Sequence, residues 1–219
     1  MTRIIKPESL HLQAYHILKE EILEGEYKPS ERIVEAKAAS KLGISRGPVR
    51  EAIRMLIQDG LLTYNEGYVR VYTPTVQDVV DIFQCRESLE ALAISLAIYH
   101  ITEVEKEQLT NNLQATYQAY EQQKTIELGK LDQEFHDIII HASKNKQLKE
   151  LLEVIRTKIH YMRISMVKGE FYPSFVSEHE RLAELLFKRN EAEANELMKQ
   201  HIKKGLDGVL MHIEKAQSR

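Results

Sequence analysis

The sequence lacks the features that mark several special classes of protein. It has one cysteine, Cys85, so neither an intrachain disulfide nor a cysteine-based zinc finger can form. It has no run of about 18 apolar residues, which argues against a membrane-spanning helix. Its N-terminus has no apolar segment of the signal-peptide type. Nine glycines and five prolines are too few for a collagen-like or low-complexity chain. We therefore expect a folded, cytoplasmic protein.

The chain also lacks a large excess of charge of either sign. The formal net charge is −3, from 30 basic and 33 acidic side chains. Residues 1–73 contain 11 lysines and arginines against 10 acidic residues, and residues 74–219 contain 19 against 23. Because this balance favours no partner by itself, a nucleic-acid-binding function would have to depend on a local cluster of cations.

Helical periodicity of apolar residues is abundant in the N-terminal third. It predicts helices over about 9–23, 34–42 and 46–59, and a β-hairpin over 61–72 with a turn at Asn65-Glu66-Gly67. Three helices followed by a hairpin is the order of a winged helix-turn-helix. Thr73-Pro74 interrupts the pattern, so we predict two domains, 1–73 and 74–219.

The remainder of the chain reads as helical throughout. Six amphipathic helices are predicted, over about 75–99, 102–123, 125–142, 145–167, 174–189 and 191–215. Helices of this length joined by short loops form antiparallel bundles. The predicted fold class is therefore mainly α, a winged helix-turn-helix followed by an all-α antiparallel bundle of six to seven helices.

The third predicted helix carries a row of cations. Arg46, Arg50 and Arg54 are spaced four residues apart, so their side chains share one helix face. In the major groove, arginine can bind guanine through two hydrogen bonds. Ser45 and the helix N-terminus can reach a phosphate, and Gly67 at the hairpin tip allows close backbone approach to the minor groove. The alternative is that these arginines form an ordinary solvated helix face.

At these residues the sequence resembles a known family. Residues 42–56, LGISRGPVREAIRML, together with Pro29-Ser30-Glu31-Arg32 and Asp59-Gly60-Leu61-Leu62, resemble the GntR family of bacterial transcription regulators. The resemblance implies a DNA-binding role for the serine, arginine and glycine positions of the motif and for the glycine at the wing tip. Some relatives have a further DNA-contacting arginine where this sequence has Ala36. The predicted DNA-binding residues are Arg32, Ser45, Arg46, Gly47, Arg50, Arg54 and Gly67.

Four polar residues of the helical part form a second candidate site. Asp132 and His136 are four residues apart and so share a helix face, whereas His179 and His201 belong to two later helices. Three imidazoles and one carboxylate can surround a divalent ion in the core of a bundle. The spacing alone is a weak signal, because Asp-x-x-x-His arises often by chance.

The helical part also resembles the FCD effector domain of the FadR subfamily. That resemblance implies a divalent metal of the zinc, nickel or manganese class, bound by Asp132, His136, His179 and His201. It also implies a small carboxylate effector beside the metal. Arg86 matches an inward-facing arginine of the subfamily and Arg163 is a weaker candidate, so both are predicted to bind the effector. The alternative for Arg86 is an intrahelical ion pair with Glu90.

The predicted function is a homodimeric bacterial transcription regulator, expected to be a repressor, that binds a palindromic operator in double-stranded DNA. A small carboxylate would control its operator affinity. No catalytic residues are predicted. Two alternatives stay open, a metal-dependent hydrolase and a DNA-binding regulator whose metal site is purely structural or senses the metal itself.

Overall fold

The structure is a computed structural model that describes residues 8–166 and 174–217 of the 219. The chain divides into two compact units, which are described separately. The N-terminal unit consists of the chain up to Pro74 together with residues 160–165. The C-terminal unit consists of the remaining residues.

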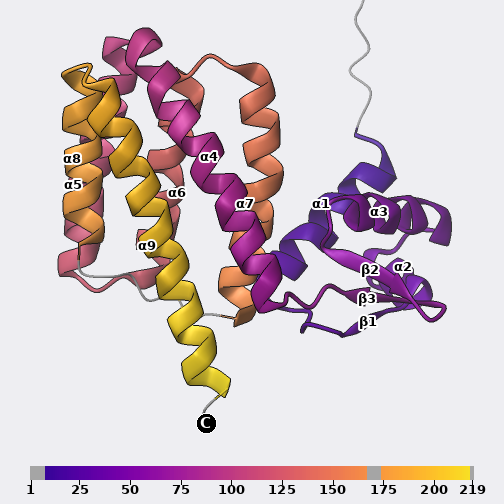
Figure 1. The fold of residues 1–219 in the computed structure, drawn as a ribbon. Coiled ribbons are helices and arrows are strands. Elements are labelled where there is room, and N and C mark those ends of the chain that lie inside the picture. The colour runs from indigo at the N-terminus through magenta and orange to yellow at the C-terminus, as the bar shows by residue number, and fades with distance from the viewer. Residues whose placement is uncertain (1–7, 167–173, 218–219) are drawn as a thin grey trace, which may run out of the picture. The chain divides into compact units, whose positions relative to one another are not determined.

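The N-terminal unit contains three helices and a small sheet (Figure 1). Its elements are α1 (Leu10–Leu23), β1 (Arg32–Ile33), α2 (Glu35–Leu42), α3 (Arg46–Gln58), β2 (Leu62–Asn65) and β3 (Tyr68–Val71). The strands form an antiparallel sheet in the order β1-β3-β2. The hairpin β2–β3 confirms the predicted wing. Strand β1 was not predicted, because two residues are too few to show the alternation of a strand.

Helix α3 packs its apolar face into the core of this unit. Val49, Ala52, Ile53 and Leu56 are buried there, together with apolar side chains of α1 and of the sheet. Gly43 ends α2 in the left-handed conformation, with φ of 67°, a backbone shape that glycine adopts without steric cost. Helix α3 begins at Arg46, directly after the tight turn that follows Gly43. Because the apolar face of α3 is buried, the opposite face, which carries the arginines, is exposed.

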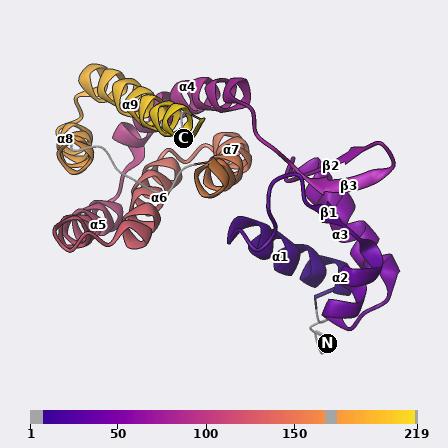
Figure 2. The ribbon, with the colours of Figure 1, turned by 90° about the horizontal axis from the view of Figure 1, so that it is seen from below.

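The C-terminal unit is entirely helical over the residues that the structure describes. Its helices are α4 (Val76–His100), α5 (Glu103–Glu121), α6 (Thr125–Ala142), α7 (Lys146–Met166, except residues 160–165), α8 (Phe175–Phe187) and α9 (Glu191–Gln217). Helix α4 lies beside α9, α5 lies beside α6, and α8 contacts both α5 and α9 (Figure 2). These helices confirm the predicted fold class. Within the described residues, every helix is either too short or too polar to cross a lipid bilayer.

Two capping boxes fix where α4 and α5 begin. The Thr75 hydroxyl accepts from the Asp78 backbone N–H while the Asp78 carboxylate accepts from the Thr75 backbone N–H. Thr102 and Glu105 repeat the arrangement at the start of α5. Each box satisfies donors that the first helical turn leaves unpaired, so these starts are set by local sequence.

Candidate metal centre and nucleic-acid interface

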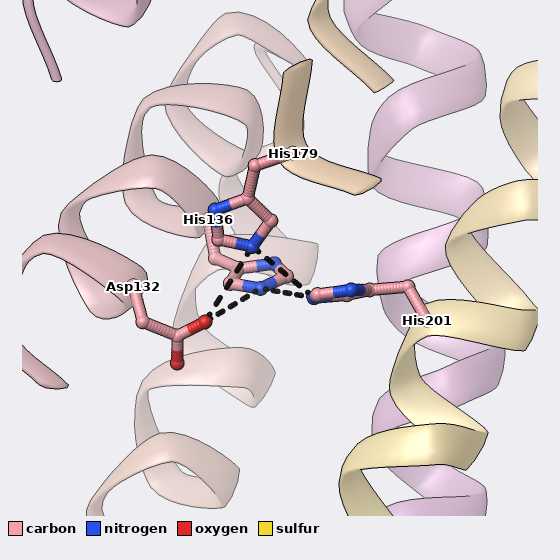
Figure 3. Close-up of side chains that lie close together, drawn as sticks. All are labelled: Asp132, His136, His179 and His201. Atoms are coloured by element: carbon pink, nitrogen blue, oxygen red, sulfur yellow. Dashed lines mark hydrogen bonds and ion pairs between the residues drawn. The ribbon is translucent and has the colours of Figure 1, made fainter. Parts of the chain in front are cut away.

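The structure brings the four predicted metal ligands together in the interior of the helical unit. Asp132 and His136 come from α6, His179 from α8 and His201 from α9, and their side chains converge (Figure 3). All four are buried, with exposures of 3, 3, 0 and 4%. One donor atom of each lies within 4.8 Å of the donor atoms of the other three. Four potential ligands therefore surround a single point.

The distances between the donor atoms match the coordination sphere of a small divalent ion. Nε2 of His201 lies 3.2 Å from Nε2 of His179 and 3.3 Å from Nε2 of His136. Oδ1 of Asp132 lies 3.6 Å from Nε2 of His136 and 3.5 Å from Nε2 of His179. An ion with bonds of about 2.0–2.2 Å holds neighbouring ligands roughly 3.0–3.5 Å apart. These four distances are close to those between neighbouring ligands of such an ion, and the other two donor–donor distances are no longer than 4.8 Å.

Electrostatics favour the neutral form of two of the imidazoles. Burial, with the nearby His201, lowers the pKa of His179 well below its usual value. Burial also lowers the pKa of His201, although the hydrogen bond to Glu178 opposes this shift. Neutral imidazoles carry the ring lone pair that a metal ion requires, so these two residues are in the state suited to ligation.

His136 has a different environment because Glu90 of α4 lies beside it. Burial opposes the charged form of both residues, but the carboxylate raises the pKa of His136, and Arg86 and His136 together lower the pKa of Glu90 to about 2. Nδ1 of His136 forms a close ion-pair contact with Oε2 of Glu90 that is not aligned as a hydrogen bond. An anionic side chain therefore lies behind the ring of this candidate ligand, on the side away from the cluster.

Arg86 is paired with Glu90 in this structure. Its Nε donates to Oε1 of Glu90 over 2.5 Å, and both side chains are buried. This is the intrahelical pair that the sequence offered as the alternative to an effector contact. Arg163, the second predicted effector residue, lies in α7, and its side chain is outside the described residues.

Sequence reasoning missed the contacts that Glu178 makes beside the cluster. This carboxylate is buried on α8, and its Oε2 lies 3.0 Å from Nδ1 of His201. Its Oε1 accepts from Ser174 Oγ at 2.7 Å and from Lys204 Nζ at 2.5 Å. No local pattern marks it, because its partners His201 and Lys204 belong to another helix.

The arginine face of α3 is exposed as the sequence predicts. Arg46, Arg50 and Arg54 all face solvent. Arg50 forms a two-pronged ion pair with Glu35 of α2, and Nη1 of Arg54 lies 2.7 Å from Oε1 of Glu51. In the protein without DNA, the guanidinium groups of Arg50 and Arg54 are therefore each paired with a glutamate.

The residues at the start of α3 are open to solvent. Ser45 stands at the N-cap position with an extended backbone, and its hydroxyl makes no capping hydrogen bond. Gly47, in the first turn, is exposed, and a methyl group placed there would meet no atom within 4 Å. The backbone at this helix N-terminus is thus accessible to a phosphate group.

The sheet that contains the wing carries two further cations, Arg32 of β1 and Arg70 of β3. Gly67 at the wing tip is exposed, with φ of 81°, a conformation that other residues rarely adopt. The Arg32 guanidinium stacks over the Tyr68 ring at 3.8 Å from the ring centre. Arg32 and Arg70 are directly paired across β1 and β3, so both lie on the same face of the sheet.

Comparison with family models matches two segments of the chain. Residues 10–68 match the model of the bacterial regulatory proteins of the gntR family, and residues 81–204 match the FCD domain. The first match covers the winged unit with its arginine face. The second contains all four members of the buried cluster.

Curated relatives align over most of their length. The HTH-type transcriptional regulator YdhC of Bacillus subtilis is 36% identical, over 91% of this chain and 89% of its own. The HTH-type transcriptional repressor GlaR of Escherichia coli is 27% identical, over 87% of this chain and 91% of its own. The Nta operon transcriptional regulator of Aminobacter aminovorans is 31% identical, over 84% and 87%. These relatives are regulators of transcription, not enzymes.

Solved structures share the fold. Escherichia coli McbR/YncC aligns with a TM-score of 0.78 and 21% identity, covering 94% of this chain and 99% of its own. A GntR-type regulator from Rhodococcus sp. RHA1 aligns with a TM-score of 0.76 and 22% identity, covering 93% and 98%.

Proposed function

The chain belongs to the GntR family of bacterial regulatory proteins and carries an FCD domain, and from this premise we propose that it is a repressor controlled by a small carboxylate bound beside a divalent metal. We place it in the FadR subfamily. It acts as a homodimer on a palindromic operator, because two symmetric winged units add their contacts. The observation that carries the proposal is the buried cluster of one aspartate and three histidines.

The DNA-binding half of the proposal rests on the exposed face of α3. Arg46 reads base edges in the major groove, and the open backbone around Ser45 and Gly47 receives a phosphate. Gly67 brings the wing tip close to the minor groove, and Arg32 contributes a phosphate contact from the sheet. Arg50 and Arg54 join the interface when DNA displaces their glutamate partners.

The metal-binding half rests on the donor set. Asp132 supplies an anionic oxygen and the three histidines supply Nε2, a combination suited to zinc, nickel or manganese. When bound there, the ion would supply a Lewis-acidic centre for an oxygen of the effector carboxylate. The protein's own residues hold the ion and exclude bulk water, since all four are buried.

The proposed effector response runs through Arg86. A carboxylate effector held beside the metal would compete with Glu90 for the Arg86 guanidinium, and α4 would then adjust its contacts with α6 and α9. Such a ligand changes operator affinity only to the extent that it binds the two arrangements of the helices differently. Arg163 of α7 is proposed as a second contact for the effector.

The Arg86–Glu90 pair also favours a second candidate function. Because an internal carboxylate already satisfies Arg86, the site can respond to the metal alone. In this case the regulator is a metal sensor, or the metal has a purely structural role.

One experiment separates these possibilities. The full-length protein, with and without Zn²⁺, is incubated with random duplexes to select an operator, and binding to that duplex is then titrated against a panel of small carboxylic acids. We expect selection of a palindrome and weaker binding with at least one acid only when metal is present. Failure to select any sequence over random competitor would overturn the DNA-binding proposal. A response to Zn²⁺ with none to the acids would support the metal sensor instead.

A further inference from the structure

The histidines of the cluster differ in what lies behind their rings. All three present Nε2 to the cluster, so Nδ1 of each points away from it. A neutral imidazole has one protonated nitrogen, and only the other one can bind a metal. The contact at Nδ1 therefore decides whether Nε2 is available as a ligand.

Glu178 is positioned to determine which ring nitrogen of His201 carries the proton. Its Oε2 lies 3.0 Å from Nδ1 of His201, within the buried core. An ionised carboxylate can only accept a hydrogen bond, so it requires the proton on Nδ1 and leaves the lone pair on Nε2.

Glu178 is itself held from two sides. Ser174 Oγ donates to its Oε1 at 2.7 Å, and the half-exposed Lys204 donates at 2.5 Å. Lys204 belongs to α9, less than one turn beyond His201, so the same helix supplies both the ring and the cation that anchors its acceptor. The carboxylate therefore has a fixed position and a compensated charge.

The other two histidines lack a well-aligned hydrogen bond from Nδ1 to a carboxylate. Beside His136, Glu90 lies against Nδ1 and is paired with Arg86, but the contact is not aligned as a hydrogen bond. The buried Nδ1 of His179 has no hydrogen-bond partner. Its ring instead stacks on the Phe135 ring, with 3.9 Å between the ring centres. Packing orients His179, whereas hydrogen bonding orients His201.

We propose that Glu178 is a positioning residue of the metal centre, which fixes His201 in the tautomer with a free Nε2 and so raises the affinity for a divalent ion. This inference rests on the proposed metal site. Lys204 and Ser174 support it by holding the carboxylate in place. Glu178 fixes the tautomer of His201 before a metal ion binds, so its effect should be measurable in the metal-free protein.

The test uses the full chain with Glu178→Met, which removes the acceptor at similar size, and Glu178→Gln, which keeps a neutral amide in the core. The first readout is Zn²⁺ affinity, measured by competition with a chelator. The second is the tautomer of His201 in the metal-free protein, read from the ¹⁵N shifts of its ring. The same two substitutions at Glu184, a half-buried residue of α8 paired with Arg181 and Lys188, serve as matched controls.

We expect Glu178→Met to weaken Zn²⁺ binding by roughly 10-fold to 100-fold, and Glu178→Gln to fall between it and the wild type. The His201 tautomer becomes mixed in both, and the Glu184 variants match the wild type. Affinity within twofold of the controls, together with an unchanged tautomer, overturns the inference. If Glu178→Met does not fold, Glu178→Gln decides by the same two readouts. Absence of Zn²⁺ binding in the wild type would instead overturn the proposed metal site, and the tautomer would still test the positioning role.

Discussion

Arg50 of α3 and Glu35 of α2 form a two-pronged ion pair, with Nη2 2.9 Å from Oε2 and Nε 3.1 Å from Oε1. The two residues are 15 positions apart in the sequence and meet because α2 and α3 pack together. The pair lowers the pKa of Glu35, so its carboxylate stays charged beside the proposed DNA-binding face. In the proposed complex, DNA has to compete with Glu35 for Arg50.

Glu35→Gln should strengthen binding to random DNA. The substitution releases Arg50 and removes a negative charge that repels phosphates, so we expect affinity for random duplex to rise by about twofold to fivefold. The ratio of operator to random affinity should fall. Fluorescence anisotropy at two salt concentrations measures both quantities, and unchanged random binding would show that the pair does not restrain Arg50.

Arg46→Ala should remove sequence preference while leaving the fold intact. Arg46 is exposed at the start of α3, and loss of a two-hydrogen-bond contact to a base reduces discrimination by roughly 5-fold to 150-fold. Circular dichroism and melting temperature should match the wild type. A gel shift in which the variant still prefers the operator as strongly as the wild type would contradict the assigned role.

Removal of the metal should lower the stability of the helical unit, and His179→Ala should abolish the metal effect. An ion present at about 100 times its dissociation constant stabilises the folded state by about 2.7 kcal/mol. We expect elemental analysis to find close to one ion per wild-type chain and almost none in the variant. The quantity to compare is the shift in melting temperature on adding Zn²⁺, because loss of a buried ring destabilises the protein by itself. His141→Ala, an exposed position on α6, is the control that should keep both the ion and the shift.

Stability should depend on pH through Glu105. Burial opposes its ionisation, but Lys144 Nζ at 2.6 Å and the Thr102 cap lower the pKa of Glu105 below its usual value. A carboxyl with a lowered folded-state pKa stabilises the protein above its unfolded-state pKa of about 4.3, and this contribution disappears as the pH falls through the folded-state pKa.

Glu105→Gln should therefore be less stable than the wild type at pH 7, by up to about 1 kcal/mol for the lost ion pair with Lys144, because glutamine can still complete the capping box. The difference should shrink as the pH falls below about 4. Chemical denaturation at pH 7 and pH 3.5 measures it. Glu103→Gln, an exposed residue in the same helical turn paired with Lys106, should show a much smaller difference at both pH values.

Gly43→Ala should destabilise the winged unit through the backbone alone. Gly43 has φ of 67°, and a methyl group there would meet no atom within 4 Å, so the cost is conformational and amounts to about 1 kcal/mol. Amide hydrogen exchange across α2 and α3 should become faster. A methyl group on Gly208 in α9 would likewise meet no atom within 4 Å, but the backbone there has no left-handed φ, so Gly208→Ala should be neutral or stabilising.

The local features of the chain could be predicted because each depends on neighbouring residues. The Thr75–Asp78 box starts α4, Gly43 ends α2, and the spacing of Arg46 and Arg50 places them on one face of α3. Strand β1 escaped prediction since its two residues become a strand only by pairing with β3.

The candidate metal site could be predicted only in part from neighbouring residues. Asp132 and His136 share a helix face by spacing, and the Arg86–Glu90 pair was foreseen as an intrahelical alternative. The meeting of His179 and His201 with them was a weak expectation from the residue types and helices alone, which the resemblance to a family strengthened. The contact of Glu178 with His201 had no signal at all.

By itself the sequence determined where helices begin and end and which side chains share a helix face, because hydrogen bonds and side-chain direction repeat over three or four residues. Only the tertiary structure decided which faces meet. It set Glu35 against Arg50, Glu90 behind His136 and Glu178 behind His201. These partners lie on different helices, so their contacts depend on how the helices pack in three dimensions, which no short stretch of sequence specifies.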